Sequence, residues 1–436
     1  MSIYNLISFI GIFLLMGIAY LCSSNKKVMN WRVMVWGVLL QFIFAFFIFI
    51  LPIGGRIFLI VNQIVLKILN SASAGTQFVF GRLALPPGMT NESGETSLGF
   101  FLAFQALPAV IFFSALMGLL YYFKVMPFLI QLFARLFTRL MQVSGAEALC
   151  TSSNIFVGVE SALTIRPLIS KMTRSELHTI LTAGMATIAS SVLALYVYIL
   201  QEQFPTIAGH LVSASLLSAP AALIMSKLLI PELEKPETLG IHVKPEYKKE
   251  DNVIEAIIHG TNDGVRLVVG VAALLLAFLG IVALIDLVLM QGGGLINQVT
   301  GLRFEWSLKH LLGYVFYPFT LIIGVQPADA FQIAQLIGER LVVTEATAYQ
   351  DLAVLIQSNV ITNTRSVVIC TYALCGFAHV ASLAIFVGGI SSLAPDRTKE
   401  LSRLGPRALL AATLACLMTA AVAGTFYHSG SILLGQ

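Results

Sequence analysis

Long apolar runs recur along almost the whole chain and limit the folds that it can adopt. A helix that crosses a bilayer needs roughly 20 predominantly apolar residues. Runs of this kind fall at 3–21, 32–51, 97–122, 176–200, 208–230, 267–290, 366–394 and 407–427. Only 11% of the 436 residues are charged, against about 25% in soluble domains. The sequence therefore predicts an all-α polytopic membrane protein with eight transmembrane helices, the first of which we expect to be retained.

Segments between these runs are amphipathic or polar. Residues 53–75 and 127–143 have periodic apolar positions interrupted by isolated Lys or Arg, which is typical of interfacial helices. Residues 84–98 are polar and are expected to form an exposed loop. Residues 231–252 are the longest hydrophilic stretch and predict a linker, which continues into an amphipathic helix at about 252–264.

Basic residues form four groups that predict the orientation, because Lys and Arg favour the cytoplasmic side. The groups are Lys26, Lys27 and Arg32; Lys124, Arg135 and Arg139; Arg166, Lys171 and Arg174; and Arg397, Lys399, Arg403 and Arg407. All four can be cytoplasmic only if residues 144–171 enter and leave the membrane from inside and residues 326–362 do so from outside. The sequence thus predicts two opposed re-entrant helical hairpins, with both termini outside.

The two halves of the chain resemble each other around these hairpins. Aligning Thr173-Arg174-Ser175 on Thr364-Arg365-Ser366 places Ile188 on His379 and Ser191 on Ser382. Each half predicts a hairpin with a Glu, an interrupted helix and a final helix. Such inverted repeats are typical of secondary transporters, whose sites lie between the repeats near the bilayer midplane.

This pattern predicts four parts of the chain. They are scaffold and interfacial helices at 1–143, a first transport repeat at 144–231, a linker with an interfacial helix and a scaffold helix at 232–325, and a second transport repeat at 326–436.

Glu160 and Glu345 fall at the expected tips of the two hairpins. An ionised side chain in the bilayer costs about 2.5–3.5 kcal/mol on the insertion scale unless it is paired or hydrated, so intramembrane acids are candidates for function. We expect both carboxylates to accept hydrogen bonds from a polar solute. The alternative is that each pairs with a buried Arg or caps a helix.

A cation site is predicted beside the first tip. Non-helical backbone at membrane depth must face protein or water. Freed carbonyls near Gly158 and the amide oxygen of Asn154 suit a hard cation such as sodium. A hydroxyl from Thr187 to Ser191 in the following helix could complete the shell, or these hydroxyls could bond to their own helix.

The second interrupted helix contains Cys375-Gly376-Phe377-Ala378-His379. Gly376 predicts a helix break. The repeat position of His379, beside Ser382, favours a functional role over a structural one. Phe377 could stack on a base, although a Phe in a membrane helix usually packs against its neighbours.

The sequence contains no His-Glu-x-x-His motif, nucleophile elbow, Walker loop or Rossmann fingerprint, which argues against a membrane enzyme or a primary pump. The five cysteines lie in or beside apolar runs and have no metal-binding spacing, so they are expected to be free thiols.

At these residues the sequence resembles the concentrative nucleoside transporter family in its shorter bacterial form. Besides the two Glu stretches, the shared segments are 78–81, 104–108, 111–116, 144–147, 218–221, 340–345 and 371–378. The resemblance implies a homotrimer with eight spanning helices that takes up nucleosides with sodium by an elevator-type movement.

The resemblance also implies roles for individual residues. The solute site would include Gly158, Val159, Glu160, Thr344, Glu345, Phe377, His379 and Ser382. Within it, Glu160 and Phe377 would face the base, and Glu345 and Ser382 the ribose. Sodium would be bound by Asn154, the Val157 carbonyl, Thr187 and the Ile188 backbone.

Two positions depart from the family pattern. The first tip, Gly158-Val159-Glu160, is one residue shorter than the usual Gly-Gln-Thr-Glu and lacks its Gln and Thr. His379 replaces the Asn that binds ribose, and an imidazole can change charge near neutral pH.

The resemblance therefore implies a sodium-coupled nucleoside symporter of a bacterial inner membrane, in contact with lipid and without a nucleic-acid partner. The alternative is a proton-coupled carrier of nucleosides or nucleobase-like solutes on the same fold. A membrane enzyme and a receptor that binds without transport are hypotheses of different classes.

Overall fold

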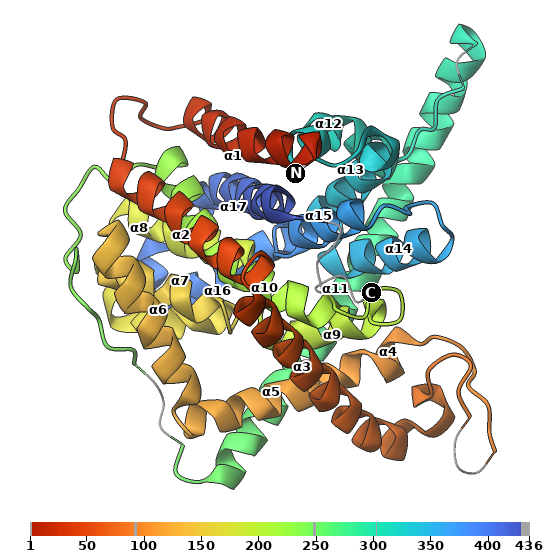
Figure 1. Cartoon of the computed structure of the whole chain (residues 1–436), viewed down its shortest axis with the longest axis horizontal. Helices are drawn as coiled ribbons and strands as arrows, with labels where there is room; N and C mark the ends of the chain where they lie inside the picture. The colour runs from red at the N-terminus through yellow and green to blue at the C-terminus, as the bar shows by residue number, and fades with distance from the viewer. Residues whose placement is uncertain (1, 91–93, 247–249, 302, 429–436) are drawn as a thin grey trace.

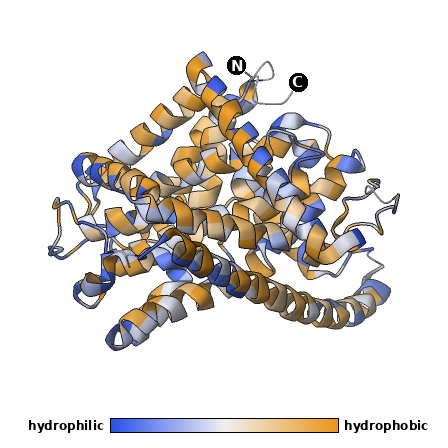
Figure 2. Ribbon diagram, turned by 90° about the horizontal axis from the view of Figure 1, so that it is seen from below, coloured by the Kyte–Doolittle hydropathy of each residue, from blue (hydrophilic) through white to orange (hydrophobic). Residues whose placement is uncertain are grey.

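The computed structural model describes residues 2–90, 94–246, 250–301 and 303–428. The regular elements in these ranges are helices, which Figure 1 labels in chain order. Apolar residues dominate most of the ribbon, as Figure 2 shows. The prediction of an all-helical membrane protein is confirmed.

Eight helical segments are long and apolar enough to cross a membrane. They are Ile3–Leu21, Trp31–Phe49, Pro52–Ala84, Leu102–Tyr122, Arg174–Leu200, Ile207–Leu229, Val253–Thr300 and Pro395–Phe426. Seven of them overlap predicted spans. Pro52–Ala84 instead contains the segment predicted to be interfacial, and the predicted span at 366–394 is divided between two helices.

The N-terminal part begins with two helices that pack on the end of the chain. Its elements are α1 (Ile3–Leu21), α2 (Trp31–Phe49), α3 (Pro52–Phe80), η1 (Gly81–Ala84), α4 (Leu102–Gln105), α5 (Leu107–Tyr122) and α6 (Val125–Met141). α1 lies along the last helix of the chain, and α2 lies along the last helix of the first repeat. The division into scaffold and transport parts stays a prediction.

The first repeat contains a hairpin, an interrupted helix and a final helix, as predicted. Its elements are α7 (Gly145–Asn154), η2 (Val159–Lys171), α8 (Arg174–Ala186), α9 (Ser190–Leu200) and α10 (Ile207–Leu229). Ser144 and Glu147 form a capping box at the start of α7, and Thr173 and Glu176 form one at the start of α8, so two backbone N–H groups are satisfied at each helix start. The returning arm of the hairpin is a 3-10 helix that contains Pro167.

The second repeat has the same order of elements. α11 (Val253–Thr300) and α12 (Leu308–Ile322) lead into the hairpin of α13 (Pro327–Val342) and α14 (Glu345–Gln357). There follow α15 (Thr364–Leu374), α16 (Val380–Leu393), η3 (Pro395–Arg397) and α17 (Thr398–Phe426). Both hairpins and both helix breaks are therefore where the sequence predicted them.

α11 differs from the prediction because it is one continuous helix, with no boundary between an interfacial helix at 252–264 and a span at 267–290. Small residues let it pack closely on α5. A Cβ on Gly260 would lie 2.6 Å from the Ser114 carbonyl oxygen, and one on Gly264 would lie 2.7 Å from the Ile111 Cα. This Gly-x-x-x-Gly spacing is typical of tight helix pairs in membranes, and it fixes one wall of the site.

Candidate functional site

The two helix breaks meet at the centre of the molecule. The first spans 187–189 and the second 375–379. The N–H of Phe377 donates to the Thr187 carbonyl at 3.4 Å. Gly376 allows this approach, because a Cβ there would lie 2.8 Å from the Ala186 carbonyl oxygen. The two repeats therefore contact each other through the irregular backbone of their helix breaks.

The first hairpin turns beside this junction. The carbonyl of Phe156 accepts a hydrogen bond from the N–H of Ser190 at 3.0 Å, so the turn at 155–158 is held against the start of α9. Half-helix ends with free N–H or C=O groups are suited to binding polar solutes and ions.

Glu345 begins α14 at the tip of the second hairpin and is only 3% exposed. The Tyr196 hydroxyl donates to its Oε1. The Nε2 atom of His379 lies 3.1 Å from its Oε2. The carboxylate is therefore held by the protein from two sides.

His379 orients this cluster because it also caps α16. Its Nδ1 accepts the N–H of Ser382 at 3.2 Å, which leaves the ring proton on Nε2. Nε2 lies 2.7 Å from the Ser382 hydroxyl and also faces Glu345. One imidazole thus connects the second hairpin to the start of α16.

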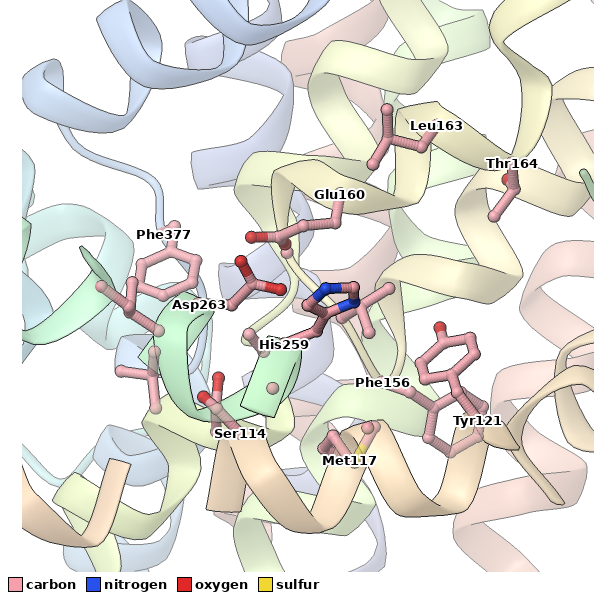
Figure 3. Close-up of a pocket in the computed structure, with 18 of the residues that line it drawn as sticks. Ser114, Met117, Tyr121, Phe156, Glu160, Leu163, Thr164, His259, Asp263 and Phe377 are labelled. Carbon is pink, nitrogen blue, oxygen red and sulfur yellow. The ribbon is translucent and has the colours of Figure 1, made fainter. Parts of the chain in front are cut away.

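Glu160, at the tip of the first hairpin, has a different environment. Its side chain is exposed to an internal cavity, and its described contacts are with backbone of the same turn, including Gly158. In Figure 3 its carboxylate lies beside Asp263 and His259, both of which come from α11. Asp263 is close enough for the two carboxylates to repel each other.

This cavity has a volume of about 710 Å³ and is lined by both hairpins, both interrupted helices, α5 and α11. Of the residues predicted to bind solute, it contains Gly158, Glu160, Thr344, Glu345, Phe377, His379 and Ser382. The side chain of Val159 lies outside the described part of the structure. Val157, predicted as a cation ligand, also lines the cavity. A cavity of this size is in the range that holds a small organic ligand.

The predicted cation ligands surround the hairpin turn and the first break. Asn154 is fully buried, and its Oδ1 accepts the Ser161 hydroxyl at 3.0 Å. The Thr187 hydroxyl donates to the Ala183 carbonyl of its own helix at 2.9 Å, which is the alternative given above for these hydroxyls. Its oxygen still has lone pairs that could face a cation. In the described residues, the carbonyls of Val157 and Ile188 accept no hydrogen bond. These oxygens are of the type that a hard cation prefers.

Sequence reasoning did not identify Tyr196, His259 or Asp263 as parts of the site. His259 and Asp263 are four residues apart on one helix face, beside Gly260 and Gly264. That spacing could have indicated a polar stripe next to a tight helix contact. Tyr196 had no comparable signal within its apolar helix.

Family models match most of the chain. The models described as the Na+ dependent nucleoside transporter N-terminus and C-terminus match residues 10–83 and 210–424. A model described as nucleoside recognition matches residues 103–202. An uncharacterized transporter of Haemophilus influenzae is 35% identical over 98% of this chain and 99% of its own length.

The chain belongs to the concentrative nucleoside transporter family. Its family consists of transporters, so the prediction that it is not an enzyme is confirmed. Mouse solute carrier family 28 member 3 is 37% identical over 96% of the chain, but the chain spans only 58% of that protein.

Two solved structures of the family member CNTnw are similar over nearly the whole chain. One is in an inward-facing substrate-bound state, with a TM-score of 0.85 and 32% identity over 97% of this chain and 98% of that chain. The other is a variant in an outward-facing state, with a TM-score of 0.85 and 31% identity over 98% of both chains. The chain is therefore a multi-pass membrane protein with the same fold as CNTnw.

Proposed function

We propose that this concentrative nucleoside transporter imports nucleosides with sodium across a bacterial cytoplasmic membrane. The observation that carries the proposal is the convergence of Glu160 and Glu345, from opposite hairpins, on one cavity of about 710 Å³. Phe377 offers a ring for stacking beside them. Carboxylates accept hydrogen bonds from the hydroxyl and N–H groups of a nucleoside.

The fixed carboxylate is assigned to the ribose and the exposed one to the base. Glu345, positioned by His379 and Tyr196, suits hydroxyl groups that occur on every nucleoside. Glu160 lies at the part of the cavity wall that would face the edge of the base, which differs between nucleosides. Thr344 and Ser382 add hydroxyls on the ribose side.

Sodium is assigned to the oxygens of Asn154, Val157, Thr187 and Ile188. A bound cation would tie the first hairpin to the first helix break, and so would order the wall that holds the solute. Coupling of this kind typically amounts to about 1–3 kcal/mol, or 5- to 150-fold in affinity.

We propose that the hairpins and interrupted helices move as an elevator along the wall of α5 and α11. The tight Gly-mediated contact between those two helices supports a rigid wall. The cavity reaches Lys124, which the charge pattern places on the cytoplasmic side. The present conformation is then inward-facing. A homotrimer completes the proposal, and cross-linking in membranes tests for three chains.

Uptake by proteoliposomes tests this function. Labelled uridine and adenosine should accumulate under an inward sodium gradient and should not accumulate when choline replaces sodium. Binding without accumulation would indicate a receptor instead.

Proton coupling is the second candidate because His379 and Glu345 are 3.1 Å apart, and an imidazole can exchange a proton near neutral pH. Accumulation in sodium-free buffer under an inward proton gradient would favour it. His379→Asn should then abolish the proton-driven component.

A further inference from the structure

α11 presents two polar side chains to the solute cavity that the proposed solute and cation sites do not use. They are His259 and Asp263, which lie on the same side of the cavity as the carboxylate of Glu160 (Figure 3). The following α11 residues that line this cavity are aliphatic, namely Leu267, Val271 and Leu274. A second cavity, of about 300 Å³, continues along the helix and is lined there by Ala272, Leu275, Leu276 and Leu279. Among the described α11 residues that line the two cavities, the polar side chains therefore lie at the end that is expected to be cytoplasmic.

Close packing fixes the position of His259. A Cβ on Gly118 would lie 2.5 Å from the Ala256 carbonyl oxygen, and one on Gly260 would lie 2.6 Å from the Ser114 carbonyl oxygen. Ala256 and Gly260 adjoin His259 on the helix, so the backbone that carries the imidazole lies directly against α5. The ring therefore belongs to the rigid wall and not to the hairpins.

A carboxylate sets the tautomer of this ring. The Nδ1 atom of His259 lies 2.9 Å from Oε1 of Glu250, which also lines the cavity. An ionised carboxylate only accepts hydrogen bonds, so Nδ1 carries the ring proton and Nε2 of the neutral ring is an acceptor. Nε2 makes no hydrogen bond with the residues that the structure describes, and the side chain is 41% exposed. His259 therefore offers one acceptor to the cavity.

Glu160 and His259 accept hydrogen bonds from the same kind of group. In the proposed site, Glu160 accepts from the N–H groups of the base, and Nε2 of His259 can accept from the same donors. The two residues belong to parts that move past each other in the proposed elevator, since Glu160 is on the first hairpin and His259 is on α11. In the present inward-facing conformation they lie close together (Figure 3).

We propose that His259 is an exit subsite for nucleosides, at which Nε2 accepts an N–H group of the base while the solute passes from Glu160 to the cytoplasm. This inference rests on the proposed function and adds a step to it. A donor that leaves one acceptor in a confined cavity loses free energy until a second acceptor replaces the first. An acceptor on the path lowers this barrier in both directions. It should therefore raise the association and dissociation rate constants equally and leave Kd unchanged.

His259→Phe tests the subsite because it keeps a ring of similar size and removes the acceptor. Binding and release of labelled uridine are followed with the purified protein in sodium. Both rate constants should fall by about three- to tenfold, the factor that one hydrogen bond between neutral groups contributes. Kd should stay unchanged. A weaker Kd with an unchanged association rate would place His259 in the main solute site, and unchanged rate constants would show that water replaces the lost partner. Either result would overturn the inference.

Three further variants separate the acceptor from the shape of the path. His259→Ala removes the ring without adding bulk and should behave like His259→Phe. His259→Gln supplies an amide oxygen as acceptor and should restore both rate constants, which a merely structural role of the imidazole does not predict. Asn262→Ala, on the same helix but outside the cavity, is the matched control. Equal slowing in the Gln, Ala and Phe variants would overturn the inference.

Uptake by the unmodified protein distinguishes this inference from the proposed function. Accumulation of uridine under a sodium gradient, together with unaltered rate constants in the Phe and Ala variants, would overturn the exit subsite alone. Binding of uridine without accumulation would contradict the proposed transport, and the rate constants of the variants would still test the subsite.

Discussion

The two hairpins have the same position in their repeats but hold their acids in opposite ways. Glu345 is buried and has two protein partners, Tyr196 and His379. Glu160 faces the open cavity and is accompanied by a second acid, Asp263. The arms differ too, since the second hairpin returns as an α-helix and the first as a 3-10 helix, whose hydrogen bonds have poorer geometry.

This difference predicts that the two acids recognise different parts of a solute in one cavity. A carboxylate fixed by its neighbours can recognise only a group that always arrives in the same place, such as the ribose. A carboxylate free in the cavity can adapt to different partners. Substitutions at the fixed acid should therefore affect every substrate, and those at the free acid should affect substrates unequally.

The largest effect is expected from Glu345→Gln. The change removes the charge that both Tyr196 and His379 support, and hydrogen bonds to a charged group contribute about 1.5–3 kcal/mol each. Initial uptake of both uridine and adenosine should fall by about 100-fold or more. Glu202→Gln, in an exposed loop, is the control and should transport normally. Wild-type uptake of either nucleoside by the Glu345 variant would remove the basis of the comparison.

Tyr196→Phe should have the next largest effect. It leaves the carboxylate of Glu345 in place but removes one of its two partners, so uptake of all nucleosides should fall by about tenfold. Tyr198→Phe is a matched control on the same helix, because Tyr198 lines no part of the cavity. If only one nucleoside were affected, Glu345 would not be the common anchor.

Glu160→Gln should change selectivity more than rate. A neutral amide both donates and accepts hydrogen bonds, so the ratio of adenosine to uridine uptake should shift by about five- to tenfold. Competition between the two labelled nucleosides measures this ratio. Glu160→Asp keeps the charge and should shift the ratio less. An equal loss for both nucleosides would show that the two hairpin acids do not differ in role.

The smallest effect is expected from Asp263→Asn. Its side chain is 64% exposed and lies 4.0 Å from Arg266, so solvent screens its charge. Removing the repulsion with Glu160 should change the apparent KM by about two- to threefold and leave the maximal rate unchanged. Asp251→Asn, in the linker, is the control. A loss as large as that of Glu345→Gln would place the decisive charge on the α11 wall.

Much of the fold was predictable because membrane burial imposes simple rules on sequence. Basic residues fixed the expected sides of the hairpins, and the repeated Thr-Arg-Ser segments located both interrupted helices. The acids at 160 and 345 marked the tips because few other charges occur at that depth. These signals are local, so one sequence suffices to detect them.

Other features depend on packing between distant segments. The amphipathic stretch at 252–264 has the pattern of an interfacial helix, but its glycines bind it to α5 and it continues into the following span. The bond from Tyr196 to Glu345 joins residues 149 positions apart. The spacing of Gly260 and Gly264 indicates a tight helix contact but not its partner α5, and no local pattern indicates the bond of Tyr196. The roles of the site residues stay predictions.

The thiol of Cys416 contacts both interrupted helices. The thiol of Cys416 on α17 lies 3.8 Å from the Ala186 carbonyl oxygen and 3.6 Å from that of Cys375. The one thiol proton can be donated to either carbonyl, so this side chain contacts the broken ends of both interrupted helices. A shift of either end alone would break its contact with Cys416, so in the proposed elevator movement we expect the ends of α8 and α15 to move together with α17.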